Sequence, residues 1–211
     1  MSKDLLFELG TEDIPPAFLP KIAGNLKHDL QNSLKDKRLN FGEIKLFYTP
    51  RRLAVIVKDL QEQQEDRIGK HRGPPKEIGL DEDGNYTVAA EKFAESHGGT
   101  KADLFVEKTE DGTYFFVEEK IEGKRTSDLL PEVLSSVIED LDQPEKMRWD
   151  DSSLRFIRPI RWLICLFGSK VVNLDIGNVN ASGYTKGHRF HGSERISIDN
   201  PDQYETKLVD N

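Results

Sequence analysis

The sequence predicts an α+β fold, in which mixed or antiparallel sheets pack against amphipathic helices in one or two lobes. Two long stretches carry apolar residues at three- and four-residue spacing, which is typical of helices. Several shorter stretches alternate apolar and polar residues, which is typical of half-buried strands. The helical and strand patterns do not alternate regularly, so a doubly wound parallel sheet is disfavoured.

The chain begins with a strand pattern followed by a long helix pattern. Residues 4–10 predict a strand with Leu5, Phe7 and Leu9 on one face. After two prolines, the apolar spacing predicts a helix of about five turns. Its expected inner face consists of Leu19, Ile22, Ala23, Leu26, Leu30 and Leu34.

Two β-rich stretches and a polar stretch come next. The stretches 44–49 and 51–60 predict neighbouring strands, separated by a tight turn at Pro50 because proline does not fit inside a central strand. Residues 61–80 are polar and contain Gly-Pro-Pro, so they predict a loop or linker.

The second half of the chain also contains both helix and strand patterns. Residues 87–98 predict a short helix that ends at Gly98. Residues 103–123 alternate around an Asp-Gly pair, a strong signal for a hairpin. A second long helix is expected at 126–141, and a further hairpin at 161–179 turning at Gly168, Ser169 and Lys170. The expected inner face of the long helix consists of Leu130, Val133, Leu134, Val137, Ile138 and Leu141.

The last residues predict the start of another helix. Asn200 is suited to the N-cap and Pro201 to the first helical position. Because domains rarely end inside a new helix, we expect this chain to be the front part of a longer protein. The expected organisation is a small lobe at 1–65, a linker at 66–80, a larger lobe at 81–199, and the start of a helix at 200–211.

The composition is that of a packed domain, with 36% hydrophobic and 32% charged residues. No apolar run approaches the ~20 residues that a membrane-spanning helix needs. The single Cys165 lies in an apolar run, which favours a reduced, cytoplasmic setting. The net charge of −8 argues against a generic nucleic-acid binder. Residues 144–195, however, carry nine basic and five acidic residues, and a basic sector can face a polyanion.

No motif for an autonomous active site is present, so we expect no catalytic residue here. Walker A, GxGxxG, GxSxG and CxxC patterns are all absent from the sequence. The stretch "GHRFHG" contains His188 and His191, but a third metal ligand with diagnostic spacing is missing. We therefore expect no metal here. We expect the histidines to contact RNA phosphate or a partner, or only to shape a turn.

The stretch "EKMRWDDSSLRFIRPIRWL" interleaves basic and aromatic residues. Arginines make bidentate phosphate contacts and aromatic rings stack on unpaired bases. Alternatively, Trp149 and Trp162 belong to the core, and the arginines pair with Asp150, Asp151 or a neighbouring subunit. The candidates for RNA or partner binding are Lys146, Arg148, Arg155, Arg158, Arg161, Lys186, His188, Arg189 and His191.

Two adjacent arginines in "YTPRRLAV" predict ion pairs with the acids near the N-terminus. Neighbouring strand residues face opposite ways, so one of Arg51 and Arg52 is expected outside and the other inside. An inward arginine needs a carboxylate, and Glu8 or Glu12 would supply it. These four residues are therefore structural ion-pair candidates. The positive end of the following helix also favours acids at Glu12 and Asp13.

Six separated motifs identify a family: "LLFELGTEDIPPAFL", "YTPRRLAV", "RGPP", "KMRW", "FIRPIRWLICLFG" and "GHRFHG". In their order and spacing they resemble the beta subunit of bacterial glycyl-tRNA synthetase. The resemblance covers nearly the whole chain, and six motifs in register make it specific. The sequence departs from the family at Asp13, where a second Glu is common, and a cap or ion pair tolerates that change better than a catalytic carboxylate.

The resemblance implies an alpha-two beta-two heterotetramer whose alpha subunit holds the class II site for glycine activation. The beta subunit of the family contributes tRNA binding and assembly, and its later regions include an HD-like domain and an anticodon-binding domain. No catalytic residue of the family maps onto this chain. The implied partners are therefore the alpha subunit and tRNA(Gly), with Mg-dependent ATP used through the alpha subunit and no cofactor bound here.

Two other functions are alternatives to tRNA binding and subunit assembly. The first is a hydrolytic editing domain that uses Glu12, Asp13, His188 and His191. Because glycine is the smallest amino acid, a synthetase can exclude larger ones sterically, so editing is less needed. The second is a scaffold that only supports later domains.

Overall fold

The computed structural model describes residues 1–81 and 83–210 and divides the chain into two compact units. Unit 1 combines Met1–Gln64 with Lys124–Asn211, and unit 2 is Glu65–Gly123. The second unit is thus an insertion within the first. This division differs from the boundaries expected from the sequence, because residues after 124 pack with the N-terminal strands. Each unit contains helices and strands, which confirms the α+β class.

Unit 1 is built on a central mixed sheet with the strand order β11-β12-β9-β1-β3-β2, and β10 also pairs with β9. The first strand, β1, lies between β3 and β9 and is antiparallel to both, whereas β12 is parallel to β9. The bounds are β1 Ser2–Thr11, β2 Ile44–Thr49, β3 Arg52–Gln61, β9 Ile160–Phe167, β10 Lys170–Val171, β11 Asp175–Ile176 and β12 Val179–Ser182. The predicted N-terminal strand is therefore central.

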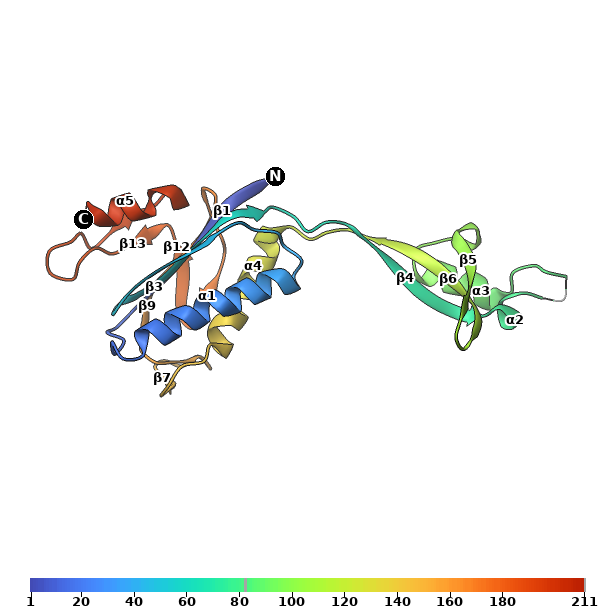
Figure 1. The fold of residues 1–211 in the computed structure, drawn as a ribbon, viewed down its shortest axis with the longest axis horizontal. Helices are drawn as coiled ribbons and strands as arrows, with labels where there is room; N and C mark the ends of the chain where they lie inside the picture. The colour runs from blue at the N-terminus through green and yellow to red at the C-terminus, as the bar shows by residue number, and fades with distance from the viewer. Residues whose placement is uncertain (82, 211) are drawn as a thin grey trace. The chain divides into compact units, whose positions relative to one another are not determined.

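One face of this sheet is covered by the two long helices, α1 (Leu19–Asp36) and α4 (Thr126–Asp140) (Figure 1). The six residues predicted as the inner face of α1 are all buried. The six predicted for the second long helix are buried too, five of them in α4 and the sixth, Leu141, directly after it. They pack on Leu5, Phe7 and Leu9 of β1, the side chains that the alternation placed on one face. These predictions are confirmed.

The other face of the sheet is covered by the C-terminal segment, residues 184–209. It contains β13 (Tyr184–Thr185), β14 (Ile196–Ser197), the short 3-10 helix η2 (Pro201–Gln203) and α5 (Tyr204–Val209). Asn200 caps η2 by accepting a hydrogen bond from the Asp202 N–H at 3.2 Å, so the predicted helix start is confirmed. A smaller core lies beneath, formed by Leu6, Ala54, Ile56, Ile164, Leu166, Ile196, Ile198 and Tyr204.

The two hairpins predicted at 103–123 and 161–179 are present, the second over a shorter range, and the described residues also form short hairpins that were not predicted. The hairpin of β5 (Leu104–Thr109) and β6 (Gly112–Ile121) turns at Asp111 with Thr109 opposite Gly112. The β9–β10 hairpin turns at Gly168, whose φ is 60°, but it ends at Val171 and does not continue to residue 179. A short hairpin joins β7 (Met147–Arg148) to β8 (Arg155–Phe156) in unit 1. The aromatic and basic stretch of the sequence therefore begins on this hairpin and continues into β9.

Unit 2 contains a three-stranded antiparallel sheet with the order β4-β6-β5 and three short helices. Its small core consists of Ala90, Ala94, Leu104, Phe115 and Val117. The bounds are β4 Arg67–Pro75, α2 Lys76–Gly79, α3 Val88–Ser96, η1 Lys101–Asp103, β5 Leu104–Thr109 and β6 Gly112–Ile121.

The prediction of a loop or linker at residues 66–80 is wrong. Residues 67–75 form β4, which is paired antiparallel with β6, and 76–79 form α2. Because β4 is an edge strand with polar, half-exposed side chains, it lacks the apolar alternation that marks a strand in a sequence. The register shifts between Arg72 and Pro75, where the two prolines lie.

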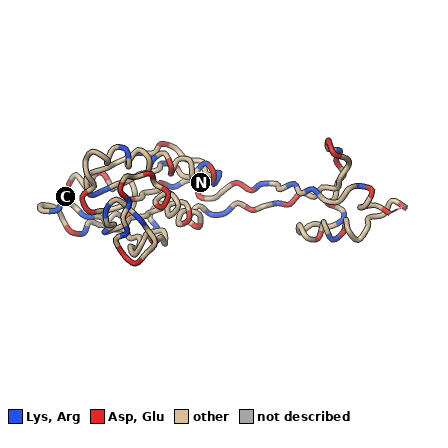
Figure 2. Tube along the Cα trace, turned by 90° about the horizontal axis from the view of Figure 1, so that it is seen from below, with Lys and Arg blue, Asp and Glu red and all other residues tan. Residues whose placement is uncertain are grey.

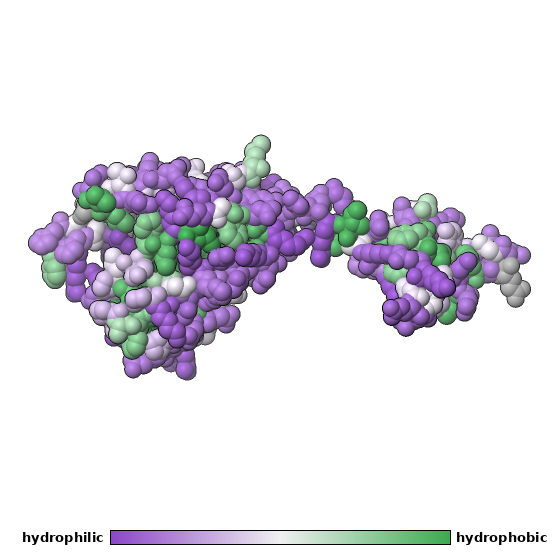
Figure 3. Space-filling model, in the orientation of Figure 1, coloured by the Kyte–Doolittle hydropathy of each residue, from purple (hydrophilic) through white to green (hydrophobic). Residues whose placement is uncertain are grey.

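Acidic residues are in excess in unit 2, although neither unit has a surface of one charge sign. Acidic and basic positions are interleaved in both units (Figure 2), although residues 65–123 carry fifteen acids against eight basic residues. A space-filling view shows separate hydrophobic patches on a largely hydrophilic surface (Figure 3). Among the described residues, no helix is long and apolar enough to cross a membrane.

Candidate functional site

The acid Glu8 is a buried hub on the face of β1 that the C-terminal segment covers. Its side chain has no exposed surface. It accepts hydrogen bonds from Trp162 Nε1, from the Thr185 hydroxyl at 2.6 Å and from the Tyr204 hydroxyl. Arg52 Nε lies 3.3 Å from Glu8 Oε1, within ion-pair distance. Four partners from β3, β9, β13 and α5 thus converge on one carboxyl group, as burial of a charge requires.

Trp162 is part of the core at this end of the sheet. It is 8% exposed, and its indole lies against the backbone of Gly10, where an added Cβ would come within 1.8 Å of the ring. The cationic groups of Arg51, Arg52 and Lys186 lie 5.6–6.0 Å from the ring centroid. Trp162 therefore supports the fold and lies beneath several positive charges, which agrees with the core alternative for this residue.

Glu12 and Asp13 form a second, more exposed layer of acid–arginine contacts. Arg161 Nε donates to Glu12 Oε1 at 2.8 Å, and Arg51 Nη2 lies 3.8 Å from Glu12 Oε2. The hydrogen bond from Arg161, with the nearby positive charges, holds the pKa of Glu12 below its usual value. A carboxylate held in this way is poorly suited to act as an acid or base near neutral pH.

Asp13 and its backbone meet two further arginines. Arg189 Nη1 lies 3.6 Å from Asp13 Oδ2, and Arg158 Nε donates to the Asp13 carbonyl oxygen at 2.9 Å. Arg161 and Arg189 are both about half exposed, at 53% and 54%. These arginines therefore combine a contact to the fold with a side open to solvent.

The sequence predicts that one inward arginine pairs with Glu8 or Glu12, and both arginines of the β2–β3 turn lie near an acid, Arg52 at 3.3 Å from Glu8 and Arg51 at 3.8 Å from Glu12. The expectation that one of the two side chains is exposed is wrong, because Arg51 is only 26% and Arg52 only 13% exposed. Arg52 also donates from Nη2 to the Lys186 carbonyl oxygen, which joins the turn to the C-terminal segment.

A cavity of about 580 Å³ lies at this end of unit 1, and we refer to it as the arginine pocket. It is bounded by the turn 49–52, the loop 187–190 and Leu208, with Asp13 and Trp162 also in its wall. Phe190 in this wall is 79% exposed. The loop is closed by a hydrogen bond from the Gly192 N–H to the His188 carbonyl oxygen at 2.8 Å. The pocket thus combines arginines, one carboxylate and an exposed ring.

The structure divides the predicted binding residues into two groups. Those that gather around the arginine pocket and its acids are Arg158, Arg161, Lys186, His188, Arg189 and, in the same loop, His191. The others belong to the β7–β8 hairpin or adjoin it, and none of them lines the pocket: Lys146, Arg148 and Arg155. Phe156 is buried, while Trp149 is 41% exposed and donates to the Phe156 carbonyl oxygen.

The two histidines of the loop stack on each other, with ring centroids 5.2 Å apart and planes 9° apart. His188 Nδ1 accepts a 3.3 Å hydrogen bond from the Phe190 N–H. Within residues 1–81 and 83–210, no three His, Cys, Asp or Glu side chains are grouped to hold a metal ion. Burial raises the pKa of the Cys165 thiol far above its usual value, so this thiol is a poor nucleophile.

Sequence reasoning missed Phe190, Thr185 and Tyr204. Phe190 lies in a glycine-flanked loop, where neither helical nor strand periodicity says whether a ring is buried. Thr185 and Tyr204 meet Glu8 across 177 and 196 residues of chain, and no local pattern reports such a contact. The position of Phe190 between an arginine and a histidine was the only available signal.

Comparisons with known proteins agree on one family. A family model described as glycyl-tRNA synthetase beta subunit matches residues 5–211. The chain is 46% identical over 209 residues to the glycine–tRNA ligase beta subunit of Bacillus subtilis, which covers 99% of this chain and 30% of that protein. The corresponding protein of Halothermothrix orenii is 41% identical over 204 residues, or 97% of this chain and 29% of its own length. The chain therefore spans about 30% of the length of these relatives.

Proposed function

Because this chain belongs to the glycyl-tRNA synthetase beta-subunit family, we propose that it is the N-terminal part of such a subunit. In this proposal it has no catalytic site of its own and supports the ATP-dependent attachment of glycine to tRNA(Gly) in the cytoplasm. Mg-dependent ATP is used by the alpha subunit of an alpha-two beta-two enzyme. The contribution of this chain is tRNA binding and assembly with that subunit.

The observation that carries the proposal is the gathering of arginines at one end of the central sheet. The side chains come from the turn 49–52, the segment 158–161 and the loop 187–190, which are far apart in the sequence. Acids fix one side of Arg161 and Arg189, and about half of each side chain remains exposed. Positioned guanidinium groups of this kind suit phosphate oxygens. Unit 2, with its excess of acids, is the less suitable surface for RNA.

The test uses the complete beta subunit together with its alpha subunit. Arg161→Gln and Arg189→Gln, singly and together, are compared with Arg148→Gln and Arg155→Gln on the β7–β8 hairpin. We expect weaker tRNA binding for the first pair only. The slope of log affinity against log salt should fall by roughly 0.7–0.9 per lost phosphate contact.

Assembly of the two subunits is measured on the same variants by sedimentation. If the first pair leaves tRNA affinity and its salt dependence unchanged, the RNA assignment is wrong. If the same variants dissociate the subunits without changing tRNA affinity, the surface is an interface with the alpha subunit instead. The editing alternative is not favoured, because Glu12 is ion-paired with a lowered pKa and Asp13 lies beside Arg189.

A further inference from the structure

The arginine pocket suggests a more specific role, which rests on the proposed function. We propose that the pocket holds one unpaired nucleotide of the bound RNA, with its phosphate on Arg51 and Arg189 and its base against the ring of Phe190. A volume of about 580 Å³ is within the roughly 300–1,000 Å³ typical of small-ligand sites.

Two arginines of the pocket have hydrogen-bond donors that the fold does not use. Arg51 lines the pocket with 26% of its side chain exposed, and its Nη2 lies 3.8 Å from Glu12, beyond hydrogen-bond distance. Arg189 lies 3.6 Å from Asp13, which is also too far. Arg161, in contrast, makes a 2.8 Å bond to Glu12. Arg51 and Arg189, two of the three arginines in the pocket wall, therefore have donor capacity for an anion with several oxygens, as a phosphate has.

The ring of Phe190 is exposed beside the pocket. Phe190 is 79% exposed, and its described ring contacts are with His188 at 6.2 Å and the Arg189 guanidinium at 5.6 Å. The loop that carries it is closed by hydrogen bonds from the Gly187 and Gly192 N–H groups, so the ring is held beside the pocket. Aromatic rings next to arginines form stacking platforms for unpaired bases of any sequence.

The carboxylate in the pocket wall favours a nucleotide over an acidic peptide. The pocket wall contains the Asp13 carboxylate, which is 62% exposed, together with the arginines. A nucleotide has both an anion for the arginines and N–H or 2′-hydroxyl donors for a carboxylate. An acidic side chain offers the anion alone, so a peptide would have to supply the donor for Asp13 from its backbone while its carboxylate is repelled by Asp13.

The experiment uses the complete two-subunit protein and two RNA hairpins, one blunt and one with a single-stranded overhang that contains 2-aminopurine. Fluorescence quenching reports stacking of this base. We expect the overhang to strengthen binding and its fluorescence to be quenched. Phe190→Leu should remove the quenching and weaken binding of the overhang RNA about fivefold or more, while leaving the blunt hairpin unaffected.

The matched control is Tyr48→Leu. Tyr48 is 44% exposed and next to the pocket in sequence, but it is paired with Leu53, whose side chain faces the helix-covered side of the sheet. This variant should behave as the parent protein.

Three results would overturn the nucleotide pocket. If Phe190→Leu leaves the overhang preference and quenching intact, the ring does not stack a base. If the overhang confers no advantage while blunt RNA still depends on Arg161, the pocket assignment fails but the proposed function stands. If Phe190→Leu instead weakens subunit assembly at unchanged RNA affinity, the pocket holds a protein segment. Failure of both RNAs to bind would contradict the proposed function itself.

Discussion

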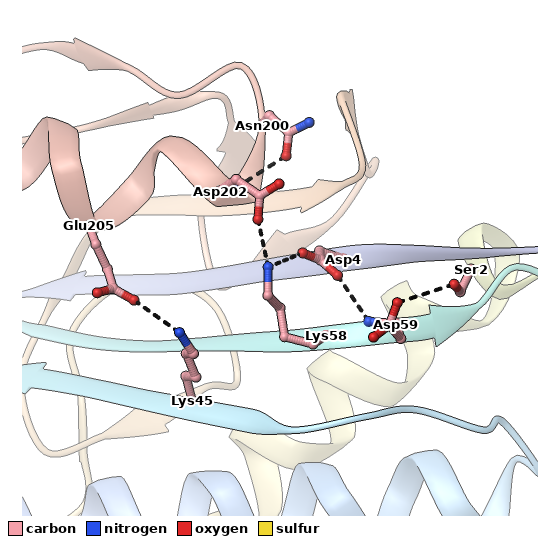
Figure 4. A network of polar contacts seen from close by, with 8 residues as sticks. All are labelled: Ser2, Asp4, Lys45, Lys58, Asp59, Asn200, Asp202 and Glu205. Carbon is pink, nitrogen blue, oxygen red and sulfur yellow. Dashed lines mark hydrogen bonds and ion pairs between the residues drawn. The ribbon is translucent and has the colours of Figure 1, made fainter.

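The two faces of β1 are stabilised in different ways. Leu5, Phe7 and Leu9 face the helices α1 and α4 through apolar contacts alone. On the opposite face of β1, the apolar Leu6 lies in the centre and charged groups lie towards both ends. At one end Lys58 lies between Asp4 and Asp202, and at the other Glu8 lies within ion-pair distance of Arg52. Figure 4 shows the Lys58 end, with Asp202 reaching it from the C-terminal segment.

The difference follows from what covers each face. Long helices bury a broad apolar stripe, and many weak contacts hold them in place. The C-terminal segment consists of short pieces with little regular structure of its own, so burial alone fixes its position poorly. Thr185 and Tyr204 donate hydrogen bonds to Glu8, and Lys58 donates one to Asp202, so directional contacts place the segment on the sheet. We infer that polar bonds specify the position of this segment.

The strongest test of this comparison is Glu8→Ala. It leaves Arg52 and three hydrogen-bond donors without their partner, so we expect a loss of about 3–5 kcal/mol in the free energy of unfolding. Glu8→Gln should cost less, because the side-chain amide oxygen still accepts hydrogen bonds. Urea unfolding measures both changes.

Hydrogen exchange locates the effect of this substitution. Glu8→Ala should increase exchange in residues 204–209, while the amides of α1 respond only through the global loss of stability. If exchange rises equally on both faces, the carboxyl group does not specifically hold the C-terminal segment, and the comparison is wrong.

The next effect is smaller and concerns Gly10. Gly10→Ala places a Cβ against the Trp162 ring, so we expect a loss of about 1–3 kcal/mol from overpacking. The matched control is Gly24→Ala in α1, where the added Cβ meets nothing within 4 Å. There the better helix propensity of alanine should stabilise the protein by about 0.5–1 kcal/mol. Equal effects of the two substitutions in thermal unfolding would show that the ring moves aside at little cost.

These two glycines illustrate what the sequence could and could not predict. The inner face of α1 was predicted residue by residue, because its period lies within one segment. The pairing of "TPRR" with the early acids was also predictable, since an inward arginine requires a carboxylate nearby. The requirement for glycine at position 10 could not be predicted, because it arises from contact with a tryptophan about 150 residues away in the sequence.

The candidate site was predicted less well than the fold. Lys146, Arg148 and Arg155 share a stretch of sequence with Arg158 and Arg161, but the hairpin and strand that follow separate them. Conversely, the pocket brings the turn 49–52 next to the loop 187–190. Such proximity depends on strand order, which residue periodicity does not encode. The strand β4 was missed because an edge strand needs hydrogen bonds more than apolar side chains.

The smallest expected effect concerns Asp4. Burial alone would raise its pKa, but hydrogen bonds from Lys58 and from the Asp59 N–H hold the pKa below its usual value. Bonds to Asp202 and Asp4 raise the pKa of Lys58. An acid with a lowered pKa stabilises the fold above about pH 4, and this stabilisation is lost as the pH falls. A lysine with a raised pKa stabilises the fold below about pH 10, and this stabilisation is lost as the pH rises.

Asp4→Asn should therefore cost about 1 kcal/mol near pH 7, and its stability should approach that of the parent below pH 4 and above pH 10. Asn still accepts the Asp59 N–H bond, so the change isolates the charge. The control is Asp142→Asn, which removes an exposed pair with Lys21 on the helix-covered side and should have the weaker effect at neutral pH. Thermal unfolding across pH measures both variants. If the Asp4 difference does not change with pH, this end of the sheet is held by packing, as the helix-covered face is, and the contrast between the faces is limited to Glu8.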